Sequence, residues 1–433
     1  MIISLICACS VLGGCKDRDK KTYIDLDSDY SVLDSELAEK LEKAATPLDT
    51  VVTDYNQHTY NRYGYATFDD RYLYCYTDMG YDPNNSWDSQ VKQLYKIDIL
   101  SGEVIPMCDD PGCTHDYETY PYCINNNQVL YYHCCAVGDE LWCIDGSKIV
   151  VRKGGSSEVI FENSYCGEFE ENYYKDSLNA KYSIHRFEVD DDYIYIFGPS
   201  YTYRVDRKTM KAEKPIVICD YAGFSVLASG AVAGSKMYTV NDLDEMFLVD
   251  YETGEATKIF DKRKHQTVYN ETLYYIRWDS DLEEPSDMDD YPDWDSYTAA
   301  IDEYLAGLKP VLCSSELDGS NEKELFTNIA GDYAIKDGKV FYHEFNGDES
   351  YVIRCHDLET GKSKVIYDDL AYCSAILTAE HIDRIFFIGD TAEQYVVDED
   401  GMPIPIYTKI ISLRADGSDM WEVTVDGTDE VLY

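Results

Sequence analysis

Three cysteines and one histidine lie close together in the first third of the chain. Their spacing is Cys108-x4-Cys113-x-His115-x7-Cys123, and Asp-Asp-Pro-Gly separates the first two cysteines. A turn at that sequence brings the first two thiols together. Three thiolates and an imidazole suit a tetrahedral zinc site. The same thiols could instead pair as disulfides in an exported protein, or remain ordinary buried or surface thiols.

The cysteine count suits the disulfide interpretation. Removing Cys7, Cys9 and Cys15, which lie in or directly after an apolar leader, from the fifteen cysteines leaves twelve, an even number. Pairing partners cannot be assigned, because Cys134 and Cys135 are adjacent and Cys143 follows closely. The segment from 108 to 115 resembles a Cys-Asp-Pro-x-Cys-x-His element of surface lipoproteins of unknown role, with one extra Asp.

A second candidate site is an acidic insertion from Asp279 to Pro310. Its first half is rich in carboxylates, which are the ligands that Ca²⁺ prefers, but it lacks the ordered spacing and central glycine of an EF-hand loop. A solvated acidic loop is therefore the alternative to a calcium site. The second half predicts a helix, with Tyr297, Ile301, Tyr304 and Leu308 on one side.

Aromatic residues accompany the acids of this insertion. Tyr291, Trp294 and Tyr297 form a mixture with carboxylates that suits stacking on sugars or docking on a basic protein surface. Long loops on rigid scaffolds often carry function. We therefore predict a binding rim at these three residues; the alternative is a mobile loop that binds no ligand.

The chain contains none of the motifs that usually mark catalysis. There is no phosphate-binding glycine loop, no Gly-x-Ser-x-Gly and no His-Glu-x-x-His, and the eight histidines are scattered. His343 and His356 fall in or near strands, where a hydrogen-bonded structural role is expected. We assign no catalytic residue, and the sequence favours a protein that is not an enzyme.

The elements that position these residues repeat along the chain. One half of the repeat is an apolar strand rich in aromatic residues, which fits the 41 tyrosines of the composition. The six examples are Arg71–Thr77, Asp192–Gly198, Ser235–Asn241, Glu271–Trp278, Gly338–Phe345 and Asp383–Asp390.

The other half of the repeat is a strand, a tight turn and a returning strand. Asp accepts hydrogen bonds from the turn backbone, and a Gly four residues later takes the positive φ that closes the hairpin. The turn begins at Asp98, Asp250 and Asp357, and a version with Met210 in place of the glycine begins at Asp206.

A shorter form of the turn reads Asp318-Gly319-Ser320. Corresponding positions recur every 42 to 44 residues, as between Met210 and Gly254 or Gly319 and Gly361. This period is typical of one four-stranded propeller blade. The sequence predicts an all-β fold, a β-propeller with seven blades; six or eight also fit. The seven units span roughly 60–125, 126–165, 183–222, 223–266, 267–332, 333–373 and 374–430. We expect the segment 60–68 to add a strand to the last blade and close the ring.

The repeat resembles TolB-type and low-density-lipoprotein-receptor-type propellers across most of residues 60–430. That resemblance implies a fold and a tendency to bind partners, but no activity.

The N-terminal end of the sequence indicates export. An apolar run too short to span a bilayer ends in Leu12-Gly13-Gly14-Cys15, and charged residues follow at once. This resembles the lipobox of bacterial lipoproteins, and the resemblance implies that Cys15 becomes the lipid-modified first residue. No Lys or Arg precedes the run, which leaves open whether the natural start lies upstream of Met1.

We therefore expect a signal peptide at 1–14, a lipidated Cys and tether at 15–59 and a propeller at 60–433. Leu33, Leu37 and Leu41 predict a short tether helix.

The net charge of −46 disfavours nucleic-acid partners, because such a surface repels phosphates. No cofactor is certain; zinc and calcium are the structural candidates. The expected partners are the membrane, through the lipid anchor, and a protein or glycan ligand. The first functional hypothesis is an extracytoplasmic, non-catalytic binding module. The alternatives are a glycan- or peptide-active enzyme with a site in the propeller funnel, and an envelope-assembly or sensory component.

Overall fold

The structure is a computed structural model, and it describes most of the chain between residues 66 and 426. The described segments are 66–68, 71–81, 90–106, 126–127, 134–137, 140–153, 156–166, 182–190, 192–218, 227–233, 235–241, 245–280, 282, 285, 291–345, 351–370, 372–379, 382–390, 395–397, 403–405 and 407–426. Cys15, the predicted tether helix, and the set Cys108, Cys113, His115 and Cys123 lie outside these segments.

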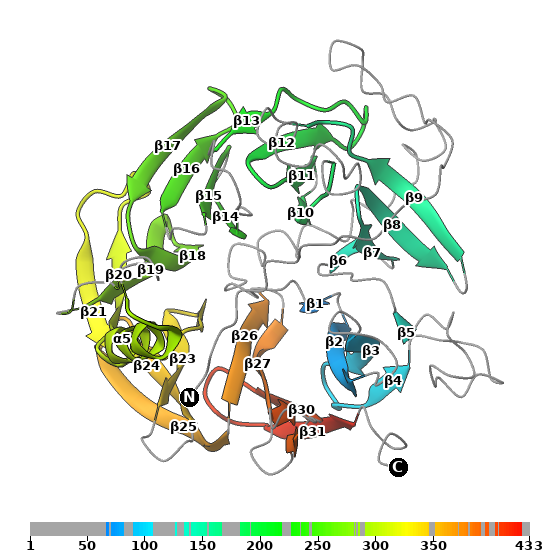
Figure 1. Ribbon diagram of the computed structural model, residues 1–433. Coiled ribbons are helices and arrows are strands. Elements are labelled where there is room, and N and C mark those ends of the chain that lie inside the picture. The colour runs from blue at the N-terminus through cyan, green and yellow to red at the C-terminus, as the bar shows by residue number, and fades with distance from the viewer. Residues whose placement is uncertain are drawn as a thin grey trace.

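Seven antiparallel sheets surround a central axis, which confirms the seven-bladed propeller (Figure 1). Neighbouring strands follow one another in the chain and pair in chain order in almost every blade. The first strand of each blade lies nearest the axis and the last lies at the periphery, as Figure 1 shows for β14 and β17.

The strands of the first three blades have the following bounds. The first blade contains β1 (Ala66–Phe68), β2 (Tyr72–Tyr81), β3 (Gln90–Asp98), β4 (Val104–Pro106) and β5 (Asn126–Asn127). The second contains β6 (Cys134–Val137), β7 (Glu140–Asp145), β8 (Lys148–Lys153) and β9 (Ser156–Glu162). The third contains β10 (Arg186–Val189), β11 (Tyr193–Phe197), β12 (Tyr201–Asp206) and β13 (Ile216–Val217).

The remaining four blades continue the same order. The fourth contains β14 (Leu227–Ala233), β15 (Lys236–Val240), β16 (Met246–Asp250) and β17 (Glu255–Phe260). The fifth contains β18 (Arg263–Tyr269), β19 (Thr272–Asp279), β20 (Lys309–Ser315) and β21 (Lys323–Thr327). The sixth contains β22 (Tyr333–Lys336), β23 (Lys339–Phe345), β24 (Tyr351–Asp357) and β25 (Lys362–Leu370). The seventh contains β26 (Tyr372–Ala379), β27 (Ile382–Asp390), β30 (Tyr407–Leu413) and β31 (Trp421–Asp426), with a hairpin of β28 (Tyr395–Val397) and β29 (Pro403–Pro405) inserted.

The predicted aromatic strands are the second strands of six blades: β2, β11, β15, β19, β23 and β27. Both faces of such a strand are buried, because its side chains alternate between the two neighbouring blades. In β11, Ile194 and Ile196 pack toward the second blade, whereas Tyr195 and Phe197 pack toward the fourth. This alternation explains why the strands are apolar throughout, with few polar positions.

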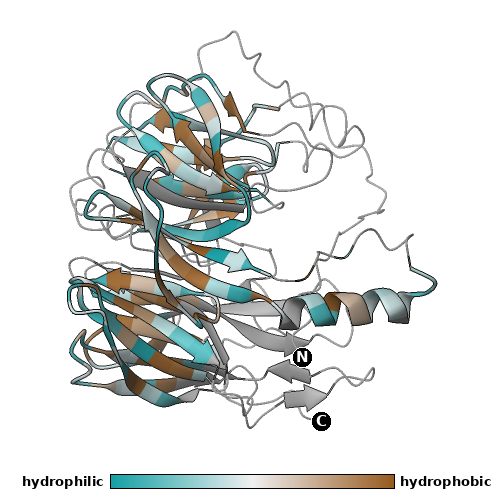
Figure 2. Cartoon of the chain, turned by 90° about the vertical axis from the view of Figure 1, so that its left-hand side faces the viewer, coloured by the Kyte–Doolittle hydropathy of each residue, from teal (hydrophilic) through white to brown (hydrophobic). Residues whose placement is uncertain are grey.

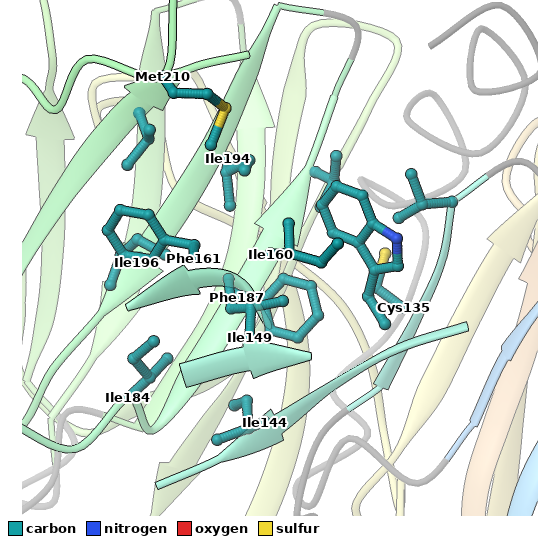
Figure 3. Packing of buried hydrophobic residues seen from close by; sticks show 14 of the residues in the cluster. Cys135, Ile144, Ile149, Ile160, Phe161, Ile184, Phe187, Ile194, Ile196 and Met210 are labelled. Carbon is teal, nitrogen blue, oxygen red and sulfur yellow. The ribbon is translucent and has the colours of Figure 1, made fainter. Parts of the chain in front are cut away.

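The core is divided among the interfaces between blades. Each of the seven interfaces holds one cluster of buried apolar residues in the described part of the chain. The cluster between the second and third blades includes Phe161, Phe187, Ile194, Ile196 and Met210 (Figure 3). Burial of this apolar surface is the main stabilising contribution to such a ring.

A buried amide fixes the second blade to the third. The Asn163 side-chain Nδ2 donates to the Tyr201 hydroxyl at 2.8 Å and to the Tyr182 carbonyl at 2.9 Å. Its Oδ1 accepts from the Tyr203 hydroxyl at 2.8 Å and from the Tyr165 backbone N–H at 3.0 Å. The side chain thereby satisfies both its donor and its acceptor in an apolar interface.

The predicted turn occurs as expected. The Asp250 carboxylate accepts hydrogen bonds from the backbone of Glu252 and Thr253, and Gly254 has a φ of +73°. Asp98, Asp206 and Asp357 accept equivalent bonds. In the copy without glycine, Met210 adopts a φ of +53° and its side chain is buried in the interface cluster. Burial of the Met210 side chain offsets the strain of a left-handed non-glycine residue.

For residues 66–68, the described part of segment 60–68, the prediction of a strand in the last blade is wrong. Ala66–Phe68 pairs with β2 of the first blade, and the last blade already has β31 as its outer strand. Side chains close the ring instead: Leu73 and Ile97 pack against Leu377 and Phe386. The Trp421 Nε1 also donates to the Ile99 carbonyl at 3.1 Å.

Gly102, in the first blade, shows how closely the two ends of the ring approach. A Cβ at this position would lie 2.9 Å from the Trp421 ring, and the residue has a φ of +73°. Glycine is therefore required here both by the turn and by the neighbouring blade.

Candidate functional site

The insertion leaves and re-enters the fifth blade at directly opposite positions. Asp279, the last residue of β19, is the register partner of Lys309, the first residue of β20. Beside this base, Arg277 Nε donates to both Asp279 oxygens at 2.9 Å, and its two terminal nitrogens bind Glu322 and Glu324. The bond to Asp279 is the main cause that raises the pKa of Arg277. The insertion is thus attached to a rigid, ion-paired edge.

Helix α5 (Trp294–Ala306) begins at a well-formed cap. Asp293 Oδ1 accepts from the Ser296 backbone N–H at 2.8 Å, and the Asp293 carbonyl accepts from Tyr297 at 3.2 Å. The hydrogen bonds from Ser296 lower the pKa of Asp293. The helix ends at Gly307, whose N–H reaches the carbonyls of Glu303 and Tyr304. The loop-helix insertion predicted from the sequence is therefore present.

The three predicted rim residues lie together at the start of α5. The Tyr297 ring centroid is 5.4 Å from that of Tyr291 and 5.8 Å from that of Trp294, and both pairs are tilted. Trp294 and Tyr297 are three positions apart, which places them on one side of the helix. We call Tyr291, Trp294 and Tyr297 the aromatic triad.

The triad lies at the outer end of the insertion. Ala306 is close in sequence to Lys309 of β20, so the Trp294 end of the helix is the distal one. In Figure 1 the helix is seen end-on, and in Figure 2 it projects sideways from one face of the ring. Trp294 is 60% exposed, and no residue of α5 whose side chain the structure describes is buried. The helix therefore presents aromatic surface away from the propeller core.

Sequence reasoning missed a buried polar pair on the inner strands. His265 in β18 has a φ of +56° at a register shift, and its Nδ1 is 3.9 Å from Asp332 Oδ1. Asp332 Oδ2 accepts from the Ile376 backbone N–H at 2.9 Å. The pair therefore links the fifth, sixth and seventh blades. His265 and Asp332 are far apart in the chain, and no sequence motif connects them, so the contact could not be predicted.

His343 supports the loop that carries Asp332. Its buried ring lies 3.6 Å from the position a Cβ would take on Gly331, whose φ is +128°. Burial lowers the pKa of His343 to about 4, so the imidazole is neutral at physiological pH. His356 Nδ1 lies 2.8 Å from Ser363 Oγ, a hydrogen bond that confirms the structural role expected for His356.

The predicted metal ligands lie outside the described residues. Cys108, Cys113, His115 and Cys123 lie between β4 and β5, and both of these strands pair with β3. The two ends of their segment thus return to one strand. Most of the acidic residues proposed for calcium also lie outside the described residues. Within the described segments, no group of three His, Cys, Asp or Glu side chains is arranged to hold a metal ion.

Among the described residues, no helix is long and apolar enough to cross a bilayer.

The sequence matches no protein-family model and no curated protein. Among solved structures, the chain is similar to the β-propeller domain of the trilobed protease from Pyrococcus furiosus, with 12% identity, 84% of this chain and 98% of that chain covered, and a TM-score of 0.43. BamB from Moraxella catarrhalis has 12% identity, coverage of 76% and 82%, and a TM-score of 0.38.

A Mycobacterium tuberculosis puromycin-hydrolyzing peptidase has 10% identity, coverage of 90% of this chain and 56% of that chain, and a TM-score of 0.49. The chain thus spans little more than half of that peptidase. Likenesses at this level concern the fold alone.

Proposed function

We propose that this protein is a lipid-anchored, extracytoplasmic β-propeller that binds a protein partner through the aromatic triad and catalyses no reaction. The observation that carries the proposal is the exposure of Trp294 at the distal end of a helix that projects from the ring. Exposed tryptophan and tyrosine side chains are typical anchors of protein interfaces. Trp294 is exposed, and Tyr291 and Tyr297 are half-buried beside it, so a small aromatic surface is free to contact a partner.

Charge around the triad indicates the chemistry of the partner. Asp293, Asp302 and Glu303 are all exposed on or beside α5, and the whole chain carries a net charge of −46. Acidic groups around an apolar anchor favour a partner surface with an apolar pocket and a basic rim. The positions of the acids also predict that binding weakens as salt rises.

The predicted export and lipid anchor support the same proposal. A lipid on Cys15, followed by a tether to residue 59, holds the propeller outside the cytoplasmic membrane, where α5 meets other envelope or surface molecules. The ring serves as a rigid scaffold, since its blades are joined by buried clusters.

The binding test compares Trp294→Ala with Leu100→Ala. Leu100 is also exposed, but it lies in a turn of the first blade. We expect a partner that is purified after capture by the wild type to bind Leu100→Ala equally and Trp294→Ala at least tenfold more weakly, as measured by calorimetry. Equal affinity for all three proteins contradicts the triad assignment. Competition by free oligosaccharides identifies a glycan ligand, and turnover in a glycan or peptide screen contradicts the non-catalytic role.

The anchor is tested separately. Radiolabelled fatty acid should enter the wild type and fail to enter Cys15→Ala in bacterial cells. Label in the variant, or no label in the wild type, contradicts the lipid anchor without affecting the binding test.

A further inference from the structure

Two cysteines of the second blade face each other across a hairpin. Cys134 of β6 and Cys143 of β7 are direct register partners, and both side chains are buried, at 2% and 1% exposed. In the structure both are thiols. Sequence reasoning could not assign a partner to either residue, because Cys135 competes with Cys134.

The hairpin register brings the two thiols within disulfide range. Val137 is opposite Glu140, so only two residues connect β6 and β7. In a hairpin of this length the closing pair is hydrogen-bonded, and the pairs alternate along the ladder. Counting back from this pair makes Cys134 and Cys143 a non-hydrogen-bonded pair, in which Cα atoms are about 4.5 Å apart. Disulfides need Cα atoms roughly 4.4–6.8 Å apart, so the backbone need not move.

The packing of the hairpin distinguishes Cys134 from its neighbour. Cys134 and Cys143 both belong to the cluster shared with Tyr74 of the first blade. Cys135 lies on the opposite face, in the cluster with the third blade (Figure 3). Burial is the main cause that raises the pKa of Cys134, and the nearby Cys143 raises it further. Of the two adjacent cysteines, Cys134 and not Cys135 therefore faces Cys143 across the hairpin.

We propose that Cys134 and Cys143 form a cross-strand disulfide when the chain folds in the presence of a disulfide oxidant. One thiolate attacks the oxidant, forming a mixed disulfide and releasing one thiol of the oxidant. The second thiolate then attacks the protein sulfur of that mixed disulfide and releases the other thiol. Two protein thiols are oxidised, one oxidant disulfide is reduced to two thiols, and the two protons pass to the departing thiolates.

The bond must form before the first and second blades pack together. Burial raises the pKa of Cys134 well above its ordinary value, which suppresses the attacking thiolate in the folded protein. The same burial shields the finished bond from reductants. The folded dithiol should consequently be inert, whereas the refolding chain should oxidise readily.

The test refolds reduced, denatured full-length protein in a glutathione redox buffer and, in parallel, in dithiothreitol. After alkylation, cleavage at Glu140 separates the two cysteines, so a disulfide appears in mass spectra as two linked peptides. We expect the link in the glutathione sample and its loss when dithiothreitol is added before digestion. Folded, reduced protein exposed to the same buffer should acquire the link at least tenfold more slowly.

Cys135→Ser is the matched control, because the residue adjoins Cys134 but faces the third blade. We expect the link to persist in Cys135→Ser and to disappear in Cys134→Ser and Cys143→Ser. Alkylation of both Cys134 and Cys143 in wild-type protein refolded with glutathione overturns the proposal. Loss of the link in Cys135→Ser with retention in Cys134→Ser overturns it as well. Fragmentation of the linked wild-type peptides shows which of Cys134 and Cys135 is alkylated, so the wild-type result decides the matter even if a variant fails to fold.

Discussion

Trp142 and Trp294 have the same side chain in opposite settings. Trp142 is fully buried between the second and third blades, in the same cluster as Phe161 and Phe187, and its Nε1 donates to Glu140 at 3.2 Å. Trp294 is 60% exposed at the start of α5, where its ring lies 5.8 Å from that of Tyr297. Trp142 thus helps to join two blades, whereas Trp294 lies on a helix that projects from the ring.

The difference separates the surface that stabilises this molecule from the surface that is available to a partner. Between the blades, the alternating side chains of the strands fill both faces of every sheet. Helix α5 contributes no fully buried side chain in its described part, so packing constrains its sequence less than it constrains the strands. The exposed Trp294 is therefore the aromatic side chain on which the proposed binding role rests.

The largest effect on stability is expected for Trp142→Ala. Removing a fully buried tryptophan leaves a cavity in the interface, and we expect a loss of about 4 kcal/mol in the free energy of unfolding. Urea denaturation followed by circular dichroism measures the change. A loss of less than about 1 kcal/mol would mean that the second and third blades are not joined by this cluster.

A second, smaller effect depends on pH. Burial lowers the pKa of His343 from an ordinary value of 6.5 to about 4. Above pH 6.5 the imidazole is neutral in both states. As pH falls toward 4 the unfolded chain binds a proton that the folded chain refuses, so stability decreases by up to about 3 kcal/mol over that range.

The variant His343→Gln should lose this part of the pH dependence. The measurement is the free energy of unfolding at several pH values between 4 and 7, compared with His356→Gln, which keeps the buried His343. Identical pH profiles for the wild type and His343→Gln would show that His343 does not titrate as its burial requires.

The smallest stability effect is expected for Trp294→Ala, the variant with the largest expected effect on binding. Its ring contributes little buried area, so the free energy of unfolding should change by no more than about 0.5 kcal/mol. Thermal unfolding of the wild type and variant side by side tests this. A destabilisation comparable to that of Trp142→Ala would mean that Trp294 stabilises the fold, as Trp142 does.

The fold was largely predictable because the repeat is carried by local chemistry. The second strand of a blade is apolar on both faces, and the Asp turn is fixed by hydrogen bonds within a few residues, as at Asp250. Even the copy without glycine at Met210 kept its turn, since the side chain gains a place in the core. These features lie within one blade and are visible in one stretch of sequence.

Features that join separate blades were not predictable in the same way. Ring closure depends on Trp421 meeting Ile99, and the inner polar pair on His265 meeting Asp332, across stretches with no shared pattern. Cys134 and Cys143 lie within one blade, but their pairing depends on the hairpin register, and a shift of one residue would turn each side chain to the other face. The aromatic triad was predicted as a group, and the structure brings its rings into contact, but its binding role stays a prediction.

Because side chains close the ring, the chain ends need not lie between the last and first blades. Every blade sheet is built from its own stretch of chain, and the junction between the last and first blades holds a buried cluster like the others. A circular permutant opened between Phe260 and Arg263, with the original ends linked, would break no sheet. The seven interfaces between blades are therefore of similar construction, and we expect the ring to tolerate chain ends at more than one of them.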